Sequence, residues 1–201
     1  MPKSVSPSVL IVAGLLSLSA CSKSPKSFSW KEEVRLNDES VIVVTQRRSC
    51  DLPIQSEKSF GCIEREAWVT LDMPQFSPQA IVWNEKLHPR IVNVYNGKLY
   101  IVGSPPTERE SRLYEIYAKP VSPYLSFLWD KGQWNRIPLA QVPEAIYGTN
   151  MLIEGIPPKD VSVLTVEVKE SRKVNGNGQY AKHLKRVDPT YIRPELPQSK
   201  E

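Results

Sequence analysis

The stretch Ile91-Val-Asn-Val-Tyr95, Asn96-Gly97, Lys98-Leu-Tyr-Ile-Val102 decides the fold, because it has the pattern of a β-hairpin. Two runs of β-forming residues flank a turn of two residues. Asn-Gly supplies the two positive-φ positions of a type I′ turn, whose twist matches the strands that it joins. Pro105-Pro106 follows and ends the second strand. We therefore expect antiparallel strands on both sides of residues 96–97.

Similar alternations of strand and turn signals lie on both sides of this hairpin. Further strands are predicted at residues 34–36, 41–45, 63–71, 124–129, 133–139, 161–169 and 180–187, and residues 80–83 are a short apolar run. Residues 47–61 are polar and include Pro53, which predicts a loop. Pro143 is suited to the first position of a single helical turn over residues 144–147. The intervals between strands are unequal, so we infer no repeat.

The predicted fold class is mainly β: a single antiparallel β domain, either a sandwich or a partly closed barrel, with one or two short helical turns. The 201 residues suit one domain, and a hydrophobic content of 40% permits a packed core. Eighteen prolines argue against long helices. The predicted organisation is a signal peptide (1–20), a lipidated tether (21–29), a β-rich domain (30–188) and a disordered tail (189–201).

The N-terminal residues indicate export and lipidation. After Lys3, the apolar run Val9 to Leu18 is shorter than the roughly 18 residues that cross a bilayer, as in a signal peptide. Leu18-Ser19-Ala20-Cys21 resembles the lipobox of bacterial lipoproteins, which implies cleavage after Ala20 and acylation of Cys21. Ser22 after the lipid site resembles outer-membrane sorting in enteric-type bacteria, so we expect a location on the periplasmic face of the outer membrane. The alternative is an ordinary secretory signal with an incidental cysteine.

Cys50 and Cys62 are the only other cysteines. Their spacing fits neither a redox C-x-x-C motif nor a zinc site. In an oxidising compartment we expect a disulfide between them, and the alternative is two buried thiols.

Three segments resemble a known family. Trp30-Lys-Glu-Glu-Val-Arg-Leu-Asn-Asp38, Asn96-Gly-Lys-Leu-Tyr-Ile-Val-Gly103 and Trp134-Asn-Arg-Ile-Pro-Leu139 are similar to the W-x-E-E-V-x-L-x-D-G, N-G-x-x-Y and W-x-R-I-P-L segments of uncharacterised proteobacterial lipoproteins. The likeness covers about residues 30 to 153. This chain has Glu39-Ser40 where the opening turn of that family carries Gly. The family has no assigned activity, so the resemblance implies fold and location and no catalytic residue.

Motifs of catalysis are missing from the sequence. It contains no G-x-S-x-G elbow, Walker loop or zincin helix. His88 and His183 are expected on the surface. Glu64 and Glu66 are expected on one strand face, with Arg65 opposite, where they could act as an acid–base pair or lie on a solvated face. We predict no catalytic residue, no metal site and no cofactor.

Two groups of residues are candidates for binding. Trp129 and Trp134 flank a hairpin turn, with Arg136 on the face of Trp134, and could form a platform for a sugar or a protein or pack into the core. A basic arm contains Lys169, Arg172, Lys173, Lys182, Lys185 and Arg186 against Glu170 alone. From this arm, Lys182, Lys185 and Arg186 are the candidates to contact anionic lipid or an acidic partner, and the alternative is a solvated hairpin.

The leading hypothesis is a lipid-anchored envelope protein that is not an enzyme and binds another macromolecule, for example as an immunity or exclusion lipoprotein. Its expected partners are the membrane, through the lipid, and an envelope or secreted protein. A net charge of +4 is too small to indicate nucleic acid. The alternatives are a hydrolase of cell-wall glycan that uses Glu64 or Glu66, and a structural component of the envelope.

Overall fold

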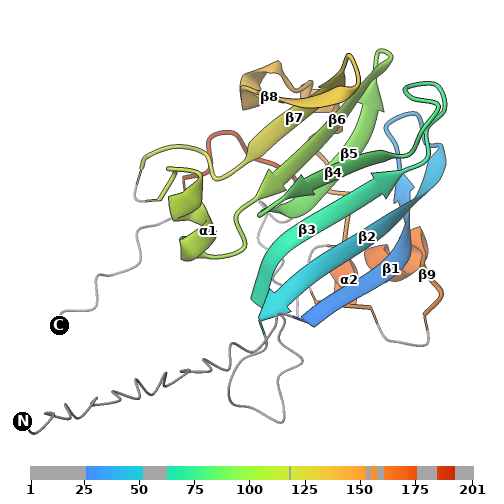
Figure 1. The fold of residues 1–201 in the computed structure, drawn as a ribbon, viewed down its shortest axis with the longest axis horizontal. Helices are drawn as coiled ribbons and strands as arrows, with labels where there is room; N and C mark the ends of the chain where they lie inside the picture. The colour runs from blue at the N-terminus through green and yellow to red at the C-terminus, as the bar shows by residue number, and fades with distance from the viewer. Residues whose placement is uncertain are drawn as a thin grey trace, which may run out of the picture.

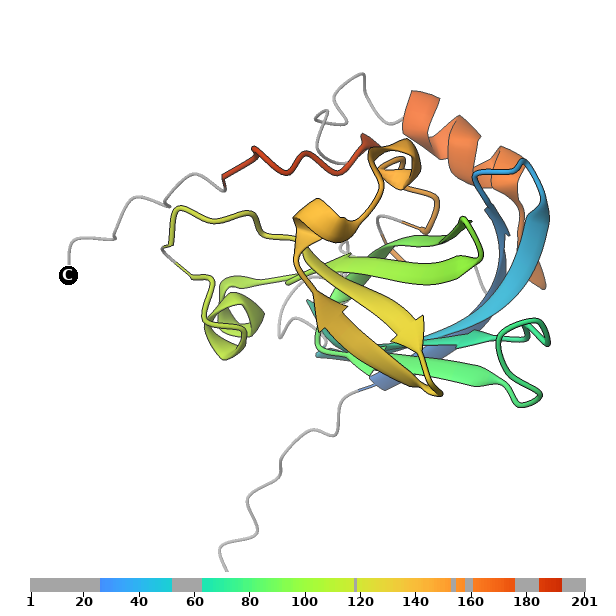
Figure 2. The same cartoon turned by 90° about the horizontal axis from the view of Figure 1, so that it is seen from above.

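The protein is mainly β and consists of two stacked sheets. A computed structural model describes residues 26–51, 63–117, 119–152, 155–157, 161–175 and 185–192. A five-stranded sheet has the strand order β4-β3-β2-β1-β9, and a four-stranded sheet has the order β5-β6-β7-β8. Figures 1 and 2 show the two sheets facing each other in an open arrangement. The predicted fold class is confirmed, in its sandwich form.

The five-stranded sheet forms first along the chain. Its strands are β1 (Lys26–Arg35), β2 (Val41–Asp51), β3 (Ile63–Leu71), β4 (Ile81–Glu85) and β9 (Val163–Leu164). The first four are antiparallel neighbours in chain order. The short strand β9 runs parallel to β1 at Lys31 and Glu32, so this sheet is not wholly antiparallel as predicted.

The four-stranded sheet is an antiparallel meander. Its strands are β5 (His88–Tyr95), β6 (Lys98–Ser104), β7 (Leu125–Asp130) and β8 (Gln133–Ile137). Asn96 and Gly97 have φ values of 48° and 69°, as the predicted hairpin turn requires. Lys131 and Gly132 form the second tight turn, with φ values of 50° and 80°.

Helices connect and flank the sheets. They are α1 (Glu108–Leu113), the 3₁₀ turns η1 (Leu139–Gln141) and η2 (Glu144–Ile146), and α2 (Val166–Asn175). The turn η2 follows Pro143 as predicted. The predicted strand at 161–169 is wrong beyond Leu164. Val166 and Lys169 are both buried and lie three residues apart, which is helical spacing, and Glu167 favours the positive end of the helix dipole.

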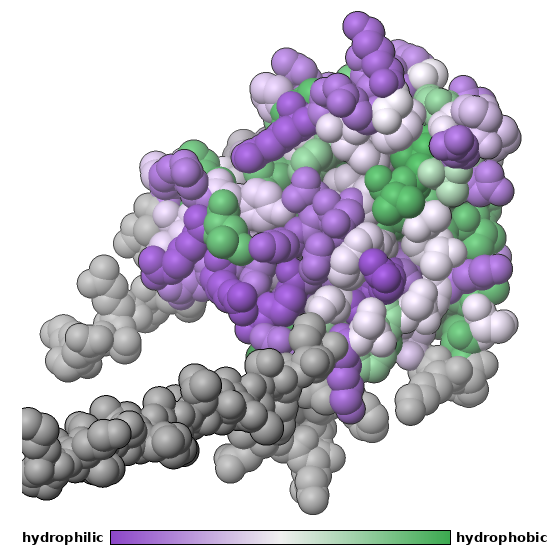
Figure 3. All heavy atoms as spheres, in the orientation of Figure 1, coloured by the Kyte–Doolittle hydropathy of each residue, from purple (hydrophilic) through white to green (hydrophobic). Residues whose placement is uncertain are grey.

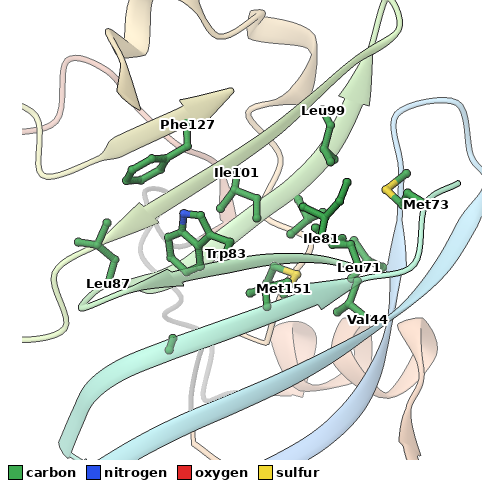
Figure 4. Close-up of a cluster of buried hydrophobic side chains, with 14 of the residues drawn as sticks. Val44, Leu71, Met73, Ile81, Trp83, Leu87, Leu99, Ile101, Phe127 and Met151 are labelled. Atoms are coloured by element: carbon green, nitrogen blue, oxygen red, sulfur yellow. The ribbon is translucent and has the colours of Figure 1, made fainter. Parts of the chain in front are cut away.

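The core lies between the sheets (Figure 4). Val44, Leu71 and Trp83 project from the five-stranded sheet toward Ile101 and Phe127 of the other. The Trp83 and Phe127 rings meet edge to face with centroids 5.7 Å apart. Packing around them is tight, because a Cβ at Gly103 of β6 would lie 3.0 Å from the Leu87 Cβ and 3.3 Å from the Trp83 ring.

Asn150 joins the two sheets at one edge. Its Nδ2 donates to the carbonyl oxygen of Arg35 in β1 at 2.9 Å and to that of Val92 in β5 at 2.7 Å. Its Oδ1 accepts from the Val92 backbone N–H at 3.0 Å. One side chain therefore satisfies both backbone polar groups of Val92 on the outer edge of β5 and connects them to Arg35 at the end of β1.

Two predicted boundaries are displaced. β1 begins at Lys26, so residues 26–29 of the predicted tether belong to the sheet. β2 continues to Asp51, so the predicted loop begins later than residue 47. Among the described residues, no helix has the length and apolar character needed to cross a membrane.

Candidate functional site

The predicted tryptophan platform is packed into the structure. Trp129 of β7 and Trp134 of β8 lie directly opposite each other, with ring centroids 5.3 Å apart at 63°. Both are half-buried against the main core, and the Trp134 Nε1–H donates to the carbonyl oxygen of Val82 in β4 at 3.1 Å. Arg136 is exposed on β8. The geometry favours the core-packing alternative, in which the tryptophans connect β8 to the edge of the other sheet.

The predicted basic arm is not one surface. Lys169 is buried inside the fold, which corrects the expectation that it belongs to an exposed cluster. Arg186 is held by Glu144, because its Nη2 donates to the Glu144 carbonyl oxygen at 3.0 Å and to its carboxylate at 3.2 Å. The Lys185 carbonyl oxygen accepts from Thr149, although the side chain is exposed. Lys182 lies outside the described residues.

Glu64 and Glu66 do not share a strand face, so that prediction is wrong, and Glu64 does not lie on a solvated face. Ser49 of β2 pairs with Glu66, but Cys50 pairs with Glu64, which leaves Arg65 as an extra residue on β3. Such a bulge reverses the alternation of side chains. Glu64 consequently points inward and is 5% exposed, whereas Glu66 accepts a hydrogen bond from Asn84 Nδ2 at 2.9 Å.

His88 is buried against Glu64, where the sequence predicted a surface histidine. Its Nδ1 lies 2.8 Å from Glu64 Oε2, and its Nε2 lies 3.0 Å from the Leu152 carbonyl oxygen. Arg48, which is only 2% exposed, places Nη1 3.2 Å from the same Glu64 oxygen. Its Nη2 donates to the Leu152 carbonyl oxygen at 2.9 Å.

The protonation states in this cluster follow from burial and charge. Burial lowers the pKa of His88 to about 4 and outweighs the charge of Glu64, which would raise it. The imidazole is therefore neutral at pH 7. Burial is the largest single influence on Glu64 and would raise its pKa, but Arg48, His88 and Arg90 together outweigh it, and the pKa is lowered. A neutral imidazole carries one N–H. Both ring nitrogens face oxygen acceptors, so this N–H can be donated to Glu64 or to Leu152 but not to both.

A second buried ion pair lies beside the first, and Gln46 connects the two. Glu32 is fully buried, and its Oε1 accepts from Lys169 Nζ at 3.1 Å. Its Oε2 accepts from Gln46 Nε2 at 2.7 Å and from Trp30 Nε1 at 2.9 Å. Gln46 Oε1 in turn accepts from Arg48 Nε at 3.2 Å.

These contacts form one continuous chain, here called the buried ionic network. Its members are Lys169, Glu32, Gln46, Arg48, Glu64 and His88. The sequence carries one signal for it: Gln46 and Arg48 continue the inward alternation of Val44, which the predicted loop at 47–61 concealed. Both cations face carboxylates, as buried charges require, so the network is suited to holding the strands together. Within the described ranges, no three His, Cys, Asp or Glu residues gather as a metal site would require.

The face of the five-stranded sheet that is turned away from the core is more exposed to solvent than the buried ionic network. Val41, Val43 and Val82 on this face are 47%, 51% and 49% exposed. Arg47 lies over the ring of Trp68, 3.8 Å from its centroid. Figure 3 views this face and shows hydrophobic surface among polar side chains, mostly on the side away from α1. In the sequence, every second residue of the alternating strands belongs to this face.

Comparison of the chain with protein-family models, with curated proteins and with solved structures found no match. The resemblance to proteobacterial lipoproteins therefore stays a prediction. Cys50 is fully buried at the end of β2, whereas Cys21 and Cys62 lie outside the described residues.

Proposed function

We propose that the chain is a lipid-anchored protein of the bacterial cell envelope, on the periplasmic face of the outer membrane, whose β domain binds another macromolecule without catalysing a reaction. The observation that carries the proposal is Leu18-Ser19-Ala20-Cys21 at the end of an apolar run too short to cross a bilayer. Two or more acyl chains at Cys21 would give stable anchoring, since each buried methylene contributes about 0.8 kcal/mol.

The position of β1 supports a domain held close to the bilayer. β1 begins at Lys26, five positions after Cys21. A chain spans at most about 3.5 Å per residue, so the strand starts within roughly 17 Å of the lipidated residue. A protein held at this distance meets partners that lie in or near the same membrane.

The state of the ionisable groups favours binding over catalysis. Glu64 and His88 are 5% and 6% exposed, and each contacts groups within the fold. A general acid must reach its substrate within hydrogen-bond distance, which these buried groups do not. Glu64 and Glu66 lie on opposite faces, so the geometry does not favour the glycan-hydrolase alternative.

A disulfide between Cys50 and Cys62 belongs to the same proposal, because it fits an oxidising compartment. Two observations support it. Cys50 is fully buried at the end of β2. It pairs with Glu64 across the strands, two positions from Cys62.

Mass spectrometry of the mature protein from membranes tests the anchor. We expect an N-terminus at Cys21 that carries diacylglyceryl and acyl groups. The Cys21→Ala variant should lose both the groups and the membrane fraction, and the Ser17→Ala variant in the apolar run should keep them. An intact Met1, or an unmodified Cys21, would contradict the proposal.

A second assay addresses catalysis. We expect the purified mature chain to release no muropeptides from cell-wall sacculi. Its release should equal that of a Glu64→Gln variant. Release by the native chain that Glu64→Gln abolishes would favour the hydrolase instead.

A further inference from the structure

We infer that residues 185–191 occupy a binding site for an extended segment of a partner protein, in which a branched apolar residue follows a basic one. We call residues 185–191 the C-terminal segment. The chain fills the site with this segment of its own, and the partner displaces it. The inference deepens the proposed function and rests on it, because it names the site at which the partner binds.

The C-terminal segment is attached to the fold as a short added strand. An isolated antiparallel bridge joins it to Gly148. On one side of this bridge, the Val187 backbone N–H donates to the Tyr147 carbonyl oxygen at 2.8 Å. On the other side, the Thr149 backbone N–H donates to the Lys185 carbonyl oxygen at 3.0 Å. Figure 2 shows the segment, coloured red, running past the 3₁₀ turns. Backbone bonds of this kind do not depend on side chains, so another extended segment can form them.

One side chain anchors the segment. Val187 is 1% exposed, whereas the other six residues of the segment are exposed or half-buried. It packs into an apolar cluster on the face of the four-stranded sheet that is turned away from the main core. Buried members of this cluster include Ile91, Tyr100, Val102, Tyr124 and Ile146. A buried anchor between exposed neighbours is the way in which an added strand is recognised.

Glu144 favours a basic residue directly before the anchor. Arg186 Nη2 donates to the Glu144 carbonyl oxygen at 3.0 Å and to its carboxylate at 3.2 Å. The guanidinium also lies 5.6 Å from the centroid of the Tyr147 ring. The Arg186 and Glu144 side chains are 50% and 81% exposed, so a basic residue of another protein can reach the same carboxylate.

The place of the segment in the chain lets it leave without opening the sheets. Every described strand, from β1 to β9, precedes it. The helix α2 ends at Asn175 and is held to β1 through Lys169 and Glu32, and residues 176–184 lie between this helix and the segment. Its own contacts near Gly148 therefore hold the segment in place. A segment that buries one side chain opens at a lower free energy than the core.

The resident segment sets the threshold that a partner must pass. It belongs to the same molecule, so it competes at a high effective concentration. A free peptide consequently binds weakly while the segment is in place. A partner at the same membrane surface is also presented at high local concentration, which is the setting that the proposed anchor supplies. The segment then acts as an internal competitor that excludes poorly matched peptides.

Peptide binding to the mature chain, purified in detergent, tests the site. The probe is a fluorescent synthetic peptide of residues 185–192, followed by fluorescence polarisation. We expect it to bind the Val187→Asp chain about tenfold more tightly than the native chain. A carboxylate is not tolerated among buried apolar side chains, so the variant segment leaves the site open. The matched control is the Ile192→Asp chain, which should bind like the native chain because Ile192 is 52% exposed.

Changes in the peptide separate the anchor from the charge. The Val187→Asp peptide should bind the Val187→Asp chain about tenfold more weakly, since the burial of a valine side chain is lost. The Arg186→Glu peptide should bind about threefold more weakly, as for an exposed ion pair. Adding Glu144→Arg to the chain should restore that loss. The Ile192→Asp peptide should bind like the native peptide.

Photo-crosslinking from position 148 of the anchored chain identifies the incoming segment. A Cβ at Gly148 meets no atom within 4 Å, so a benzophenone amino acid can be placed there. The native chain should link to its own C-terminal segment, and Val187→Asp should shift the link to another protein. The linked partner peptide should contain a basic residue followed by a branched apolar one. The synthetic peptide should compete with this link.

The inference is overturned by equal affinity of the native and Val187→Asp chains, or by no binding to the variant. It is also overturned by an unfolded Val187→Asp chain, which would make the segment part of the core, and by links to a second copy or to no protein. Acylation of Cys21 is measured in the same preparations. Peptide binding by a chain without acyl groups would refute the anchor alone, and an acylated chain that binds no peptide would refute this site alone.

Discussion

Single residues of this protein are constrained most strongly where charge is buried. Arg48 is 2% exposed and contacts Glu64, Gln46 and the carbonyl oxygens of Leu152 and Gly155. Taking such charges out of water is costly, so each depends on its partner more than it adds to stability. Removing one member of the buried ionic network should therefore cost more than the contact is worth.

The Arg48→Met variant should lose about 3–5 kcal/mol of unfolding free energy, because it leaves the carboxylate of Glu64 buried without its cation. Urea denaturation of the purified mature chain measures the loss. The double variant Arg48→Met, Glu64→Leu should recover most of it, since neither charge remains. Equal losses in the single and double variants would show that packing, and not charge, is responsible.

His88 should make stability depend on pH. Its pKa is about 4 in the folded chain and about 6.5 when unfolded, so the unfolded chain binds more protons between these values. The stabilisation is full above pH 6.5 and is lost as the pH falls toward 4, with about 2 kcal/mol lost between pH 7 and pH 5. Denaturation at both pH values in the native chain and in His88→Gln should show this difference only in the native chain. An identical pH slope in the two proteins would contradict the burial of a neutral imidazole.

Among the elements, those fixed by a local sequence signal could be predicted, and those fixed by contacts between distant residues could not. The β5–β6 hairpin could be predicted because Asn96-Gly97 fixes its turn within two residues. The ionic network could not, because Arg65 forms a bulge that moves Glu64 inward and Lys169 reaches Glu32 across 137 positions. The helix α2 was read as a strand for the same reason, since the contact that buries its face comes from β1.

The turn between β1 and β2 carries a non-glycine residue in the left-handed region. Glu39 has a φ of 67°, which costs roughly 1 kcal/mol for a residue with a Cβ, and its ion pair with Arg35 is long at 3.9 Å and exposed. Glu39→Gly should raise the unfolding free energy by up to about 1 kcal/mol, by thermal or urea denaturation. Ser40→Gly, at the next position, should not stabilise. A destabilised Glu39→Gly chain would argue that the turn is unstrained.

The attachment of α2 to β1 should depend on Lys169. Its Nζ donates to the Glu32 carboxylate and to the carbonyl oxygens of Glu33 and Asn150. In Lys169→Met we expect hydrogen exchange of the α2 amides to accelerate at least tenfold, about 1.4 kcal/mol, while the β5–β7 amides change less. Glu170→Gln on the same helix is the control. Unchanged protection of α2 would show that Val166 holds the helix without the lysine.

The whole molecule is an open sandwich, and we propose a cross-link at the end of β2. In the proposed disulfide, Cys50 and Cys62 close a loop of about 13 residues, which stabilises by roughly 3 kcal/mol in the chain-entropy model. The Cys50→Ala, Cys62→Ala double variant should lose about that amount when compared with the oxidised native chain by calorimetry. The native chain after reduction should match the variant. No difference between oxidised and reduced native chains would exclude a stabilising bridge.

The Trp134 indole donates a hydrogen bond to the Val82 carbonyl oxygen, and the Asn150 side chain contacts Val92. These contacts affect how readily crowded molecules could add to one another. They occupy backbone groups of Val82 in β4 and Val92 in β5, each of which is one of the two edge strands of its sheet and so a place where a foreign strand could add. Molecules confined to a bilayer reach high local concentrations, where unprotected strands nucleate fibrils. If the chain is anchored as proposed, these contacts would reduce the edge backbone that is open to strand addition at such concentrations.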